Sequence, residues 1–282
     1  MTSILNALTF DLEHWYSATL VRDAVDDPID RVRDSVAIVR NLLDGHDVTA
    51  TFFVVGELAR EYPDLIEQLA DDGHEIGSHG HTHTPLGDLN VDSFRRELVD
   101  SADAIEAATG RRPKGFRAPN FSVGRETVWA FNALCDEGYR YDSSVFPTWT
   151  PMYGVPEAPV RPYRVDPTDP FGPGDGELIE LPTAVAHPRV RIPIAGGFYA
   201  RMLPARMLRE GVRSLNRKGI PATLYFHPWE FNPSVTTDSP PYHARFVSFY
   251  GIERTIGKLD SLLDAFDFKP AGRVVETNGM VS

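Results

Sequence analysis

The segment Ala7-Leu8-Thr9-Phe10-Asp11-Leu12-Glu13 decides the fold class, because it joins a short apolar strand to two carboxylates. In an extended chain residues i and i+2 point to the same side, so Asp11 and Glu13 are predicted to face one pocket. In parallel α/β folds such pockets form at the carboxyl ends of the strands. One carboxylate could hold a metal ion while the other acts as a base, although a solvated acidic turn would show the same pattern.

Strands and helices alternate along the first half of the chain beyond this segment. Buried β-branched or aromatic stretches predict strands, and amphipathic stretches with capping residues predict helices. Repeated strand–helix units imply parallel strands joined by right-handed crossovers, and therefore an α/β fold. The predicted strands are 7–10, 48–55, 74–77 and 115–118, and the predicted helices are 31–43, 64–70, 91–109 and 125–137.

The pattern changes after residue 142, where Pro and Gly become frequent. Residues 146–176 are interpreted as a long ordered excursion. Beyond it the sequence predicts strands over 177–182 and 222–226, and helices over 204–218 and 244–263. No internal repeat is present, and α/β barrels of this length form one domain, so a single domain is predicted.

Charge and cysteine content exclude several classes of protein. The 282 residues include 28 basic and 40 acidic side chains, a net charge of −12 that repels nucleic acid and anionic membranes. Cys135 is the only cysteine, and its apolar neighbours predict a buried thiol. Neither a signal peptide nor a membrane-spanning run is evident, so we expect a cytoplasmic protein without a transmembrane segment. The oligomeric state has no signature in the sequence.

A dense group of histidines follows the third predicted strand, in Gly77-Ser78-His79-Gly80-His81-Thr82-His83. His79 and His83 are four residues apart, so one helical turn or a tight loop brings both imidazoles to one ion. Two His and one carboxylate, with an open position for water, form a common catalytic zinc arrangement. Cobalt, nickel or manganese would accept the same ligand types. His81 is interpreted as a neighbouring structural residue.

Two further polar residues come at the ends of predicted strands. Arg117, in Gly115-Phe116-Arg117-Ala118-Pro119-Asn120, could hold a carboxylate and keep it ionised, and a surface arginine is the alternative. His227 follows an apolar strand in Leu224-Tyr225-Phe226-His227-Pro228-Trp229-Glu230, and a satisfied core histidine is the alternative. With Asp11 and His79 they make four polar residues at strand ends, which scattered surface polarity does not explain.

Together these motifs resemble those of the NodB-type polysaccharide deacetylases, carbohydrate esterase family four, over about residues 5 to 270. The similarity is greatest to a subgroup associated with exosortase and exopolysaccharide loci. The resemblance implies a distorted (β/α)7 barrel forming one catalytic domain over residues 1–282, with a family-specific part from about 146 to 275. The matching segments are Thr9-Phe10-Asp11, Ser78-His79 through His83, Phe116-Arg117-Ala118-Pro119, Tyr141-Asp142-Ser143-Ser144, Gly196-Gly197-Phe198-Tyr199 through Pro204, and Phe226-His227-Pro228-Trp229-Glu230.

The first motif departs from the commonest family pattern, in which the second of two adjacent Asp residues binds the metal. Leu12 stands at that position and cannot ligate. A minority of relatives space the two carboxylates by one residue, and Glu13 is then the ligand beside His79 and His83. The resemblance thus implies a divalent ion, most simply Zn²⁺, held by these three residues.

The resemblance also implies the roles of the remaining residues. Asp11 is expected to act as general base, with Arg117 holding it in place. His227 is expected to protonate the leaving nitrogen. Glu230 or Asp142 could tune it, and a structural hydrogen bond is the alternative for either residue. Beside Gly196-Gly197, Phe198 and Tyr199 could offer a flat surface to a sugar ring or pack as a lid, and Trp149 and Tyr153 in the Pro-rich excursion could line a groove.

The implied activity is hydrolysis of the N-acetyl amide of an amino sugar in a polysaccharide or glycan, including a lipid-linked one, with release of acetate. Two alternatives stay open. Relatives with carboxylates spaced like Asp11 and Glu13 include hydrolases that open small cyclic imides or ureides. A non-catalytic glycan-binding protein is the second alternative.

Overall fold

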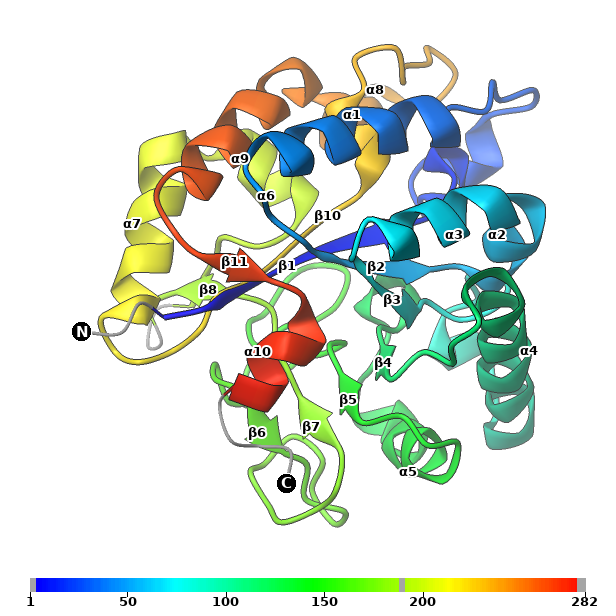
Figure 1. The fold of residues 1–282 in the computed structure, drawn as a ribbon, viewed down its shortest axis with the longest axis vertical. Helices are drawn as coiled ribbons and strands as arrows, with labels where there is room; N and C mark the ends of the chain where they lie inside the picture. The colour runs from blue at the N-terminus through cyan, green and yellow to red at the C-terminus, as the bar shows by residue number, and fades with distance from the viewer. Residues whose placement is uncertain (1–3, 188–190, 278–282) are drawn as a thin grey trace.

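A curled sheet of mainly parallel strands forms the centre of the computed structural model, which describes residues 4–187 and 191–277 (Figure 1). Its strands are β1 (Asn6–Leu12), β2 (Thr51–Val54), β3 (Glu75–Ser78), β4 (Gly115–Phe116), β5 (Tyr141–Asp142), β6 (Tyr163–Arg164), β7 (Ile179–Glu180), β10 (Thr223–Phe226) and β11 (Phe268–Lys269). They lie in the order β10-β1-β2-β3-β4-β5-β7-β6, and β11 pairs with the start of β1. Among the described strands of this sheet, only β6 runs antiparallel to its neighbour, so the predicted α/β fold with parallel strands is confirmed.

Alternating side chains of β1 face two different environments. Leu8, Phe10 and Leu12 pack in the main hydrophobic cluster with the helices outside the sheet. Ala7 faces the other way, in a cluster inside the curl that also contains Phe53. Because strand side chains alternate, Asp11 follows Ala7 onto the inner face at the carboxyl end of the strand.

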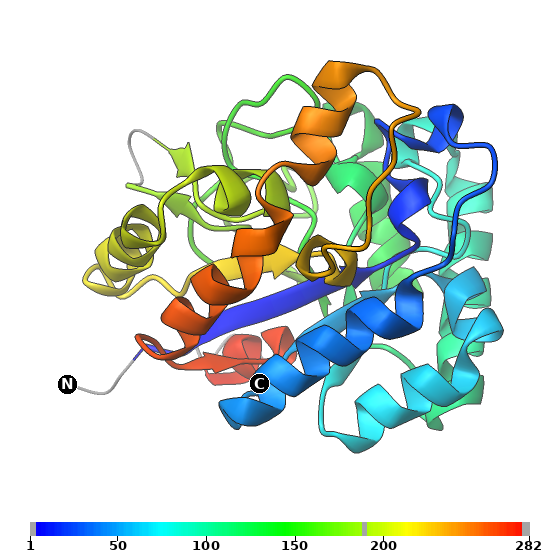
Figure 2. The same cartoon turned by 90° about the horizontal axis from the view of Figure 1, so that it is seen from above.

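Helices cover the outer face of the sheet and one end of the curl (Figures 1 and 2). Residues of α1 and α9 pack with β1 and β10 in the main cluster. Helix α10 contributes Ala271, Val274 and Val275 to the inner cluster, at the amino-terminal end of the strands. The helices are α1 (Val32–Gly45), α2 (Gly56–Glu61), α3 (Pro63–Asp71), α4 (Val91–Thr109), α5 (Trp129–Asp136), α6 (Gly197–Met202), α7 (Ala205–Asn216), α8 (Tyr242–Phe249), α9 (Thr255–Leu263) and α10 (Ala271–Thr277).

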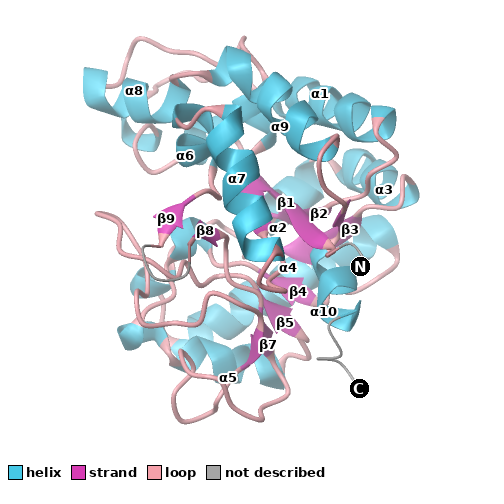
Figure 3. Cartoon of the chain, turned by 90° about the vertical axis from the view of Figure 1, so that its left-hand side faces the viewer, coloured by secondary structure: helices cyan, strands magenta, loops and turns pink. Residues whose placement is uncertain are grey.

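A short hairpin of β8 (Val185–Ala186) and β9 (Ile192–Pro193) stands apart from the main sheet, next to α7 (Figure 3). None of the described helices is both long enough and apolar enough to cross a membrane.

Backbone hydrogen bonds between strands bring the polar residues to one edge. His79 N donates to Val54 O at 2.9 Å, and Arg117 N donates to Ser78 O at 2.9 Å. Phe226, the residue before His227, is in register with Phe10, the residue before Asp11. The parallel ladder therefore places the residues that follow β1, β3, β4 and β10 side by side at the carboxyl edge.

Capping residues explain why the helix over 91–109 is predicted correctly at both ends. Asn90 accepts a hydrogen bond from Ser93 N, and the Ser93 hydroxyl accepts one from Asn90 N. Gly110 ends the helix with a φ of 71°, a left-handed conformation that glycine adopts without strain.

Two sequence expectations are wrong. The predicted helix over 244–263 is broken at Gly251, whose φ of 77° separates α8 from a short 3₁₀ turn and α9. Cys135 is exposed rather than buried, because α5 turns its core-facing side, with Phe131 and Leu134, away from it.

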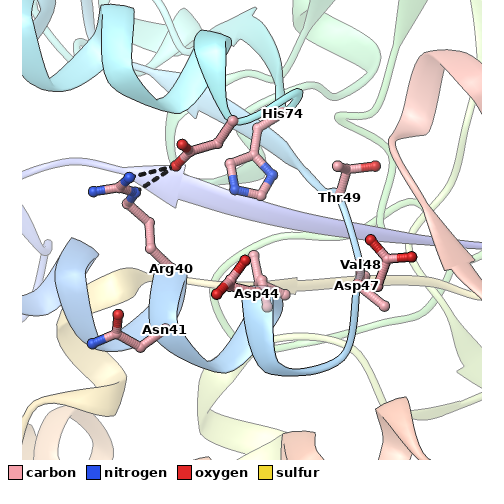
Figure 4. A pocket seen from close by; sticks show the side chains of 9 residues that line it. Arg40, Asn41, Asp44, Asp47, Val48, Thr49 and His74 are labelled. Atoms are coloured by element: carbon pink, nitrogen blue, oxygen red, sulfur yellow. Dashed lines mark hydrogen bonds and ion pairs between the residues drawn. The ribbon is translucent and has the colours of Figure 1, made fainter.

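A polar pocket of about 350 Å³ lies at the amino-terminal side of β2 and β3, opposite the carboxyl edge (Figure 4). Arg40 and Asp72, which both line this pocket, are joined by a hydrogen bond, and His74 Nδ1 accepts a hydrogen bond from Ala50 N. None of the predicted site residues lines this pocket.

Candidate active site

Asp11 and Arg117 form a buried ion pair at the carboxyl edge of the sheet. Arg117 Nη1 lies 2.7 Å from Asp11 Oδ1 and also donates to Thr9 Oγ1 at 2.8 Å. Nε and Nη2 of the same guanidinium donate to the carbonyl and hydroxyl oxygens of Ser143. The Arg117 Cζ atom lies 4.4 Å from the centroid of the Phe53 ring. Arg117 is fully buried, so the alternative of a surface arginine is wrong.

Glu13, His79 and His83 converge beside this pair. One ligand atom of each lies within 4.8 Å of the other two. His83 Nε2 is 2.6 Å from Glu13 Oε2, and the centroids of the two imidazole rings are 5.2 Å apart. All three side chains are buried, and they come from the segments that follow β1 and β3. The residues predicted to hold a metal are therefore neighbours in the fold.

The surroundings of Glu13 fit a divalent cation. Its Oε2 is buried and has no hydrogen-bond partner among the residues that the structure describes, although His83 Nε2 is in close contact. An unsatisfied buried carboxylate oxygen is costly, and a cation shared with the imidazole would satisfy it. Two ligands with bonds of about 2.2 Å can be at most about 4.4 Å apart, so small side-chain rotations bring all three atoms within reach of one ion.

The ionisation of these side chains suits metal binding. Burial raises the pKa of the Glu13 carboxyl, but the nearby imidazoles, above all His83, outweigh burial and lower the pKa to about 2. Burial lowers the pKa of the His79 imidazole to about 4. At neutral pH the carboxyl group is ionised and this imidazole is neutral, as metal ligands must be.

Hydrogen bonds fix the orientation of the imidazoles. His79 Nδ1 lies 2.8 Å from the carbonyl oxygen of Arg117, and because a carbonyl only accepts, Nδ1 carries the proton. Nε2 of His79 is then left as the ligand atom. His83 reaches the site from a left-handed backbone conformation, with a φ of 59°. The two residues thus meet through a tight loop rather than a helical turn.

Glu97, on α4, holds this loop from outside. Its carboxylate accepts hydrogen bonds from the backbone N of His81 and Thr82 at 2.7 and 2.9 Å, and from the Thr82 hydroxyl at 2.8 Å. The side chain of His81 lies next to Arg60, with Nε2 3.1 Å from Nη1. His81 therefore packs beside the cluster of predicted metal ligands and is not part of it.

His227 faces Glu13 from the end of β10, with its Nε2 3.5 Å from Glu13 Oε1. Its ring stacks on Trp229, with centroids 5.2 Å apart. On the other side of the ring, Nδ1 lies 3.2 Å from Glu230 Oε2, and Arg201 Nε donates to Glu230 Oε1 at 3.0 Å. The His227 side chain is 21% exposed, so it is not sealed in the core.

The carboxylate of Glu230 supports a protonated His227. Burial lowers the pKa of the His227 imidazole, but the hydrogen bond and charge of Glu230, followed by Glu13 and Asp11, outweigh burial and raise the pKa to about 9. Burial raises the pKa of the Glu230 carboxyl, and Arg201 and His227 outweigh it, so the net pKa is lowered. The pair is therefore ionised at neutral pH.

Of the two candidates for tuning His227, only Glu230 lies against its ring. Asp142 accepts a hydrogen bond from Ser144 Oγ at 2.5 Å and shares a buried site with the carboxyl group of Glu180. Asp142 therefore forms a buried pair of carboxyl groups with Glu180, near Arg117, and is not a partner of His227.

The two aromatic residues predicted to line a groove, Trp149 and Tyr153, lie in different environments. Trp149 is 73% exposed. Tyr153 packs with Phe121 and Phe146, and its hydroxyl lies 3.3 Å from that of Tyr225. The expectation that they contact a sugar stays a prediction.

Sequence reasoning missed two residues that hold the site together. Glu97 lies in a predicted helix without any motif, so no signal marked it. Arg201 lies inside the segment Gly196–Pro204, which resembled a family motif, and that resemblance was the available signal.

Comparison with family models divides the chain in two. Residues 7–140 match the model described as polysaccharide deacetylase, and residues 143–276 match a domain of unknown function, DUF3473. Asp11, the three predicted metal ligands and Arg117 fall in the first segment, and His227 falls in the second. The candidate site takes residues from both.

Among curated proteins, the chain is 35% identical over 74 residues to a peptidoglycan-N-acetylglucosamine deacetylase from Bacillus cereus. That match covers 26% of this chain and 27% of the relative. In the matches to this protein and to two uncharacterized curated proteins, the aligned part covers between 27% and 42% of the relative's length.

Among solved structures, a candidate polysaccharide deacetylase from Mycobacterium smegmatis has a similar fold, with a TM-score of 0.64 and 21% identity over 99% of this chain and 92% of that chain. A CE4 family pseudoenzyme from Bacillus anthracis has a TM-score of 0.51 and 17% identity, over 97% of this chain and 66% of that chain. At these identities the likeness shows the fold alone. The predicted NodB-type barrel is confirmed, in the form of a curled parallel half-barrel.

Proposed function

Because the chain contains a polysaccharide deacetylase domain over residues 7–140, we propose that it hydrolyses the N-acetyl amide of an amino sugar in a polysaccharide or glycan. The observation that carries the proposal is the pocket in which Glu13, His79 and His83 adjoin the Asp11–Arg117 pair, with His227 opposite. The name of the Bacillus cereus relative, a deacetylase of peptidoglycan N-acetylglucosamine, supports a glycan substrate.

Glu13, His79 and His83 would hold a divalent ion such as Zn²⁺, with Co²⁺, Ni²⁺ or Mn²⁺ as alternatives. When bound, such an ion polarises a carbonyl group and makes water more acidic. The Glu13 carboxylate and the imidazoles of His79 and His83 supply the ligand set, and the hydrogen bond from His79 Nδ1 to the carbonyl oxygen of Arg117 helps to keep it in place.

Asp11 is proposed as the general base. Arg117 occupies its Oδ1, which leaves Oδ2 to accept the proton of the attacking water. The guanidinium also compensates the negative charge of the buried Asp11 carboxylate and holds it in one orientation.

His227 is proposed as the general acid. An amine anion is a poor leaving group, so the amide nitrogen must be protonated as its bond to the carbonyl carbon breaks. The Glu230 carboxylate favours the charged imidazole, which then has a proton on Nε2 to give. The products are acetate and a free amino sugar.

Two other functions would use the same fold. A hydrolase of cyclic imides or ureides fits the one-residue spacing of Asp11 and Glu13. A non-catalytic glycan-binding protein has a precedent in the pseudoenzyme from Bacillus anthracis. A link to exopolysaccharide biosynthesis, a cytoplasmic location and a lipid-linked substrate stay predictions.

Acetate release and ring opening separate these functions. Purified protein would be incubated with N-acetylglucosamine oligomers and with hydantoin-like rings, each with and without a chelator. The proposal expects acetate from the oligomers alone, and only without chelator. Ring opening alone would favour the imide hydrolase, and binding of oligomers without either reaction would favour the binding protein.

A further inference from the structure

We propose that Arg201 and Gly197 position the acid His227 through the carboxylate of Glu230. Gly197 and Arg201 belong to one short helix, α6, in the segment 196–204 that no part of the proposed chemistry uses. The inference rests on the proposed function of His227 as acid, and it adds two positioning residues to that site.

The Glu230 carboxylate is the link between the helix and the imidazole. Its Oε2 accepts a hydrogen bond from His227 N at 2.9 Å and lies 3.2 Å from His227 Nδ1. An ionised carboxylate only accepts, so Nδ1 must carry the proton that lies between them. Nε2 is then the ring nitrogen turned toward Glu13 and the pocket.

Arg201 fixes the other oxygen of Glu230. Its Nε donates to Glu230 Oε1 at 3.0 Å, while Nη1 and Nη2 donate to the carbonyl oxygens of Tyr250 and Val247 at 2.8 and 2.9 Å. Those carbonyls lie at the carboxyl end of α8, where helix carbonyls lack partners within the helix. Arg201 as a whole is 3% exposed, and its guanidinium donates a hydrogen bond from each of its three nitrogens, so these bonds fix its orientation.

Gly197 provides the space for the carboxylate. A Cβ atom at this position would overlap all three atoms of the Glu230 carboxyl group. Only glycine lets the carboxylate lie against the backbone of α6, within reach of both Arg201 and His227. This explains the physical need for the second glycine of Gly196-Gly197.

A purely structural role is the competing explanation, because Arg201 also ties α6 to α8. The two roles differ in what they change. Loss of a structural tie lowers stability, whereas loss of positioning frees the His227 ring and weakens the Nδ1–H bond. A measurement on the imidazole itself therefore separates them.

The experiment uses the full chain with Zn²⁺, as wild type, Arg201→Met, Gly197→Ala and the control Arg206→Met. Arg206 is an exposed residue of α7, so its substitution removes the same charge without touching Glu230. The Nδ1–H proton resonance of ¹⁵N-labelled His227 is recorded, assigned by its loss in Glu230→Leu. Thermal melting, zinc content and steady-state deacetylation of N-acetylglucosamine oligomers accompany it.

The wild type and Arg206→Met should show a downfield Nδ1–H resonance, and Arg201→Met and Gly197→Ala should lose it. In both of these variants kcat should fall roughly 10- to 100-fold, with KM and zinc content unchanged. The proposal is overturned if folded Arg201→Met keeps the resonance and the wild-type kcat, or, should that variant not fold, if Gly197→Ala keeps both. If the wild type releases no acetate, the proposed function fails, while the resonance still decides whether Arg201 positions His227.

Discussion

Arg117 Nη1 lies 2.7 Å from Asp11 Oδ1, and the two side chains, separated by 106 positions in the chain, are both buried from solvent. The pair joins the ends of β1 and β4 across the inside of the curl. Its charges are compensated by each other and by the oxygens of Thr9 and Ser143. The stability of this pocket and the orientation of Asp11 therefore depend on the contact between these two side chains.

Arg117→Met should destabilise the protein by about 3–5 kcal/mol, because it leaves the Asp11 carboxylate buried without a partner. Urea unfolding measures the loss. The control is Arg33→Met, which breaks an ion pair between exposed side chains, Arg33 and Asp64. The control should change the unfolding midpoint far less, since exposed pairs add little to stability. Equal shifts in the two variants would contradict the buried-pair interpretation.

His83→Ala should abolish tight zinc binding, because it removes one of three ligands and leaves Glu13 Oε2 without its neighbour. The matched control is His81→Ala in the same loop, whose side chain contacts Arg60 instead. Elemental analysis after dialysis should give stoichiometric zinc for the control and little for His83→Ala. Equal zinc content in both would mean that the cluster of Glu13, His79 and His83 is not the metal site.

Glu97→Ala should lower zinc affinity by roughly 10- to 100-fold without changing any ligand. The reason is that Glu97 accepts three hydrogen bonds from the loop between His79 and His83. Competition with a zinc indicator measures the affinity. Glu106→Ala serves as control, since Glu106 lies on the same helix and pairs with the exposed Arg112. An affinity of Glu97→Ala equal to that of the control would show that the loop holds its shape without this support.

The buried acid pair Asp142 and Glu180 should contribute less to the stability of the protein as the pH rises above about 4. Burial raises the pKa of both carboxyl groups above their ordinary values, 3.8 and 4.5. The folded state then binds more protons than the unfolded state across this range, so raising the pH favours unfolding. Glu180→Gln should flatten this dependence, because its amide can donate to Asp142 without a titrating proton.

Urea midpoints of the wild type and Glu180→Gln at pH 5 and pH 8 test this prediction. The wild type should lose more stability between the two pH values than the variant does. Identical losses would show that the pair does not hold an extra proton in the folded protein.

The first half of the fold and most of the site follow from local patterns. Alternation in the first strand and the apolar stretches before His79 and His227 define strands whose ends must meet at one edge. The helix over 91–109 has strong caps at Asn90 and Gly110, so both ends are predictable. Such signals depend only on neighbouring residues.

The remaining parts depend on contacts between distant residues. Glu230 approaches Arg201 across 29 positions because Gly197 leaves room, and no periodicity shows such a fit. The apolar pattern of the sequence continues on both sides of Gly251, so it gives no sign that the helix breaks at this residue. Cys135 has apolar neighbours in the sequence, but it lies on the side of α5 that faces away from the hydrophobic core. Which side of a helix is buried depends on where the helix packs, and the neighbouring residues alone do not show this.

The most direct measurement is acetate release from N-acetylglucosamine oligomers by His227→Ala, with zinc content determined on the same sample. His227 is not one of the three predicted ligands, so the variant should keep stoichiometric zinc. Without an acid for the leaving nitrogen, its rate should fall by roughly 100- to 10,000-fold relative to the wild type. Acetate release at the wild-type rate from zinc-loaded His227→Ala would contradict the proposed acid and the deacetylase chemistry built on it.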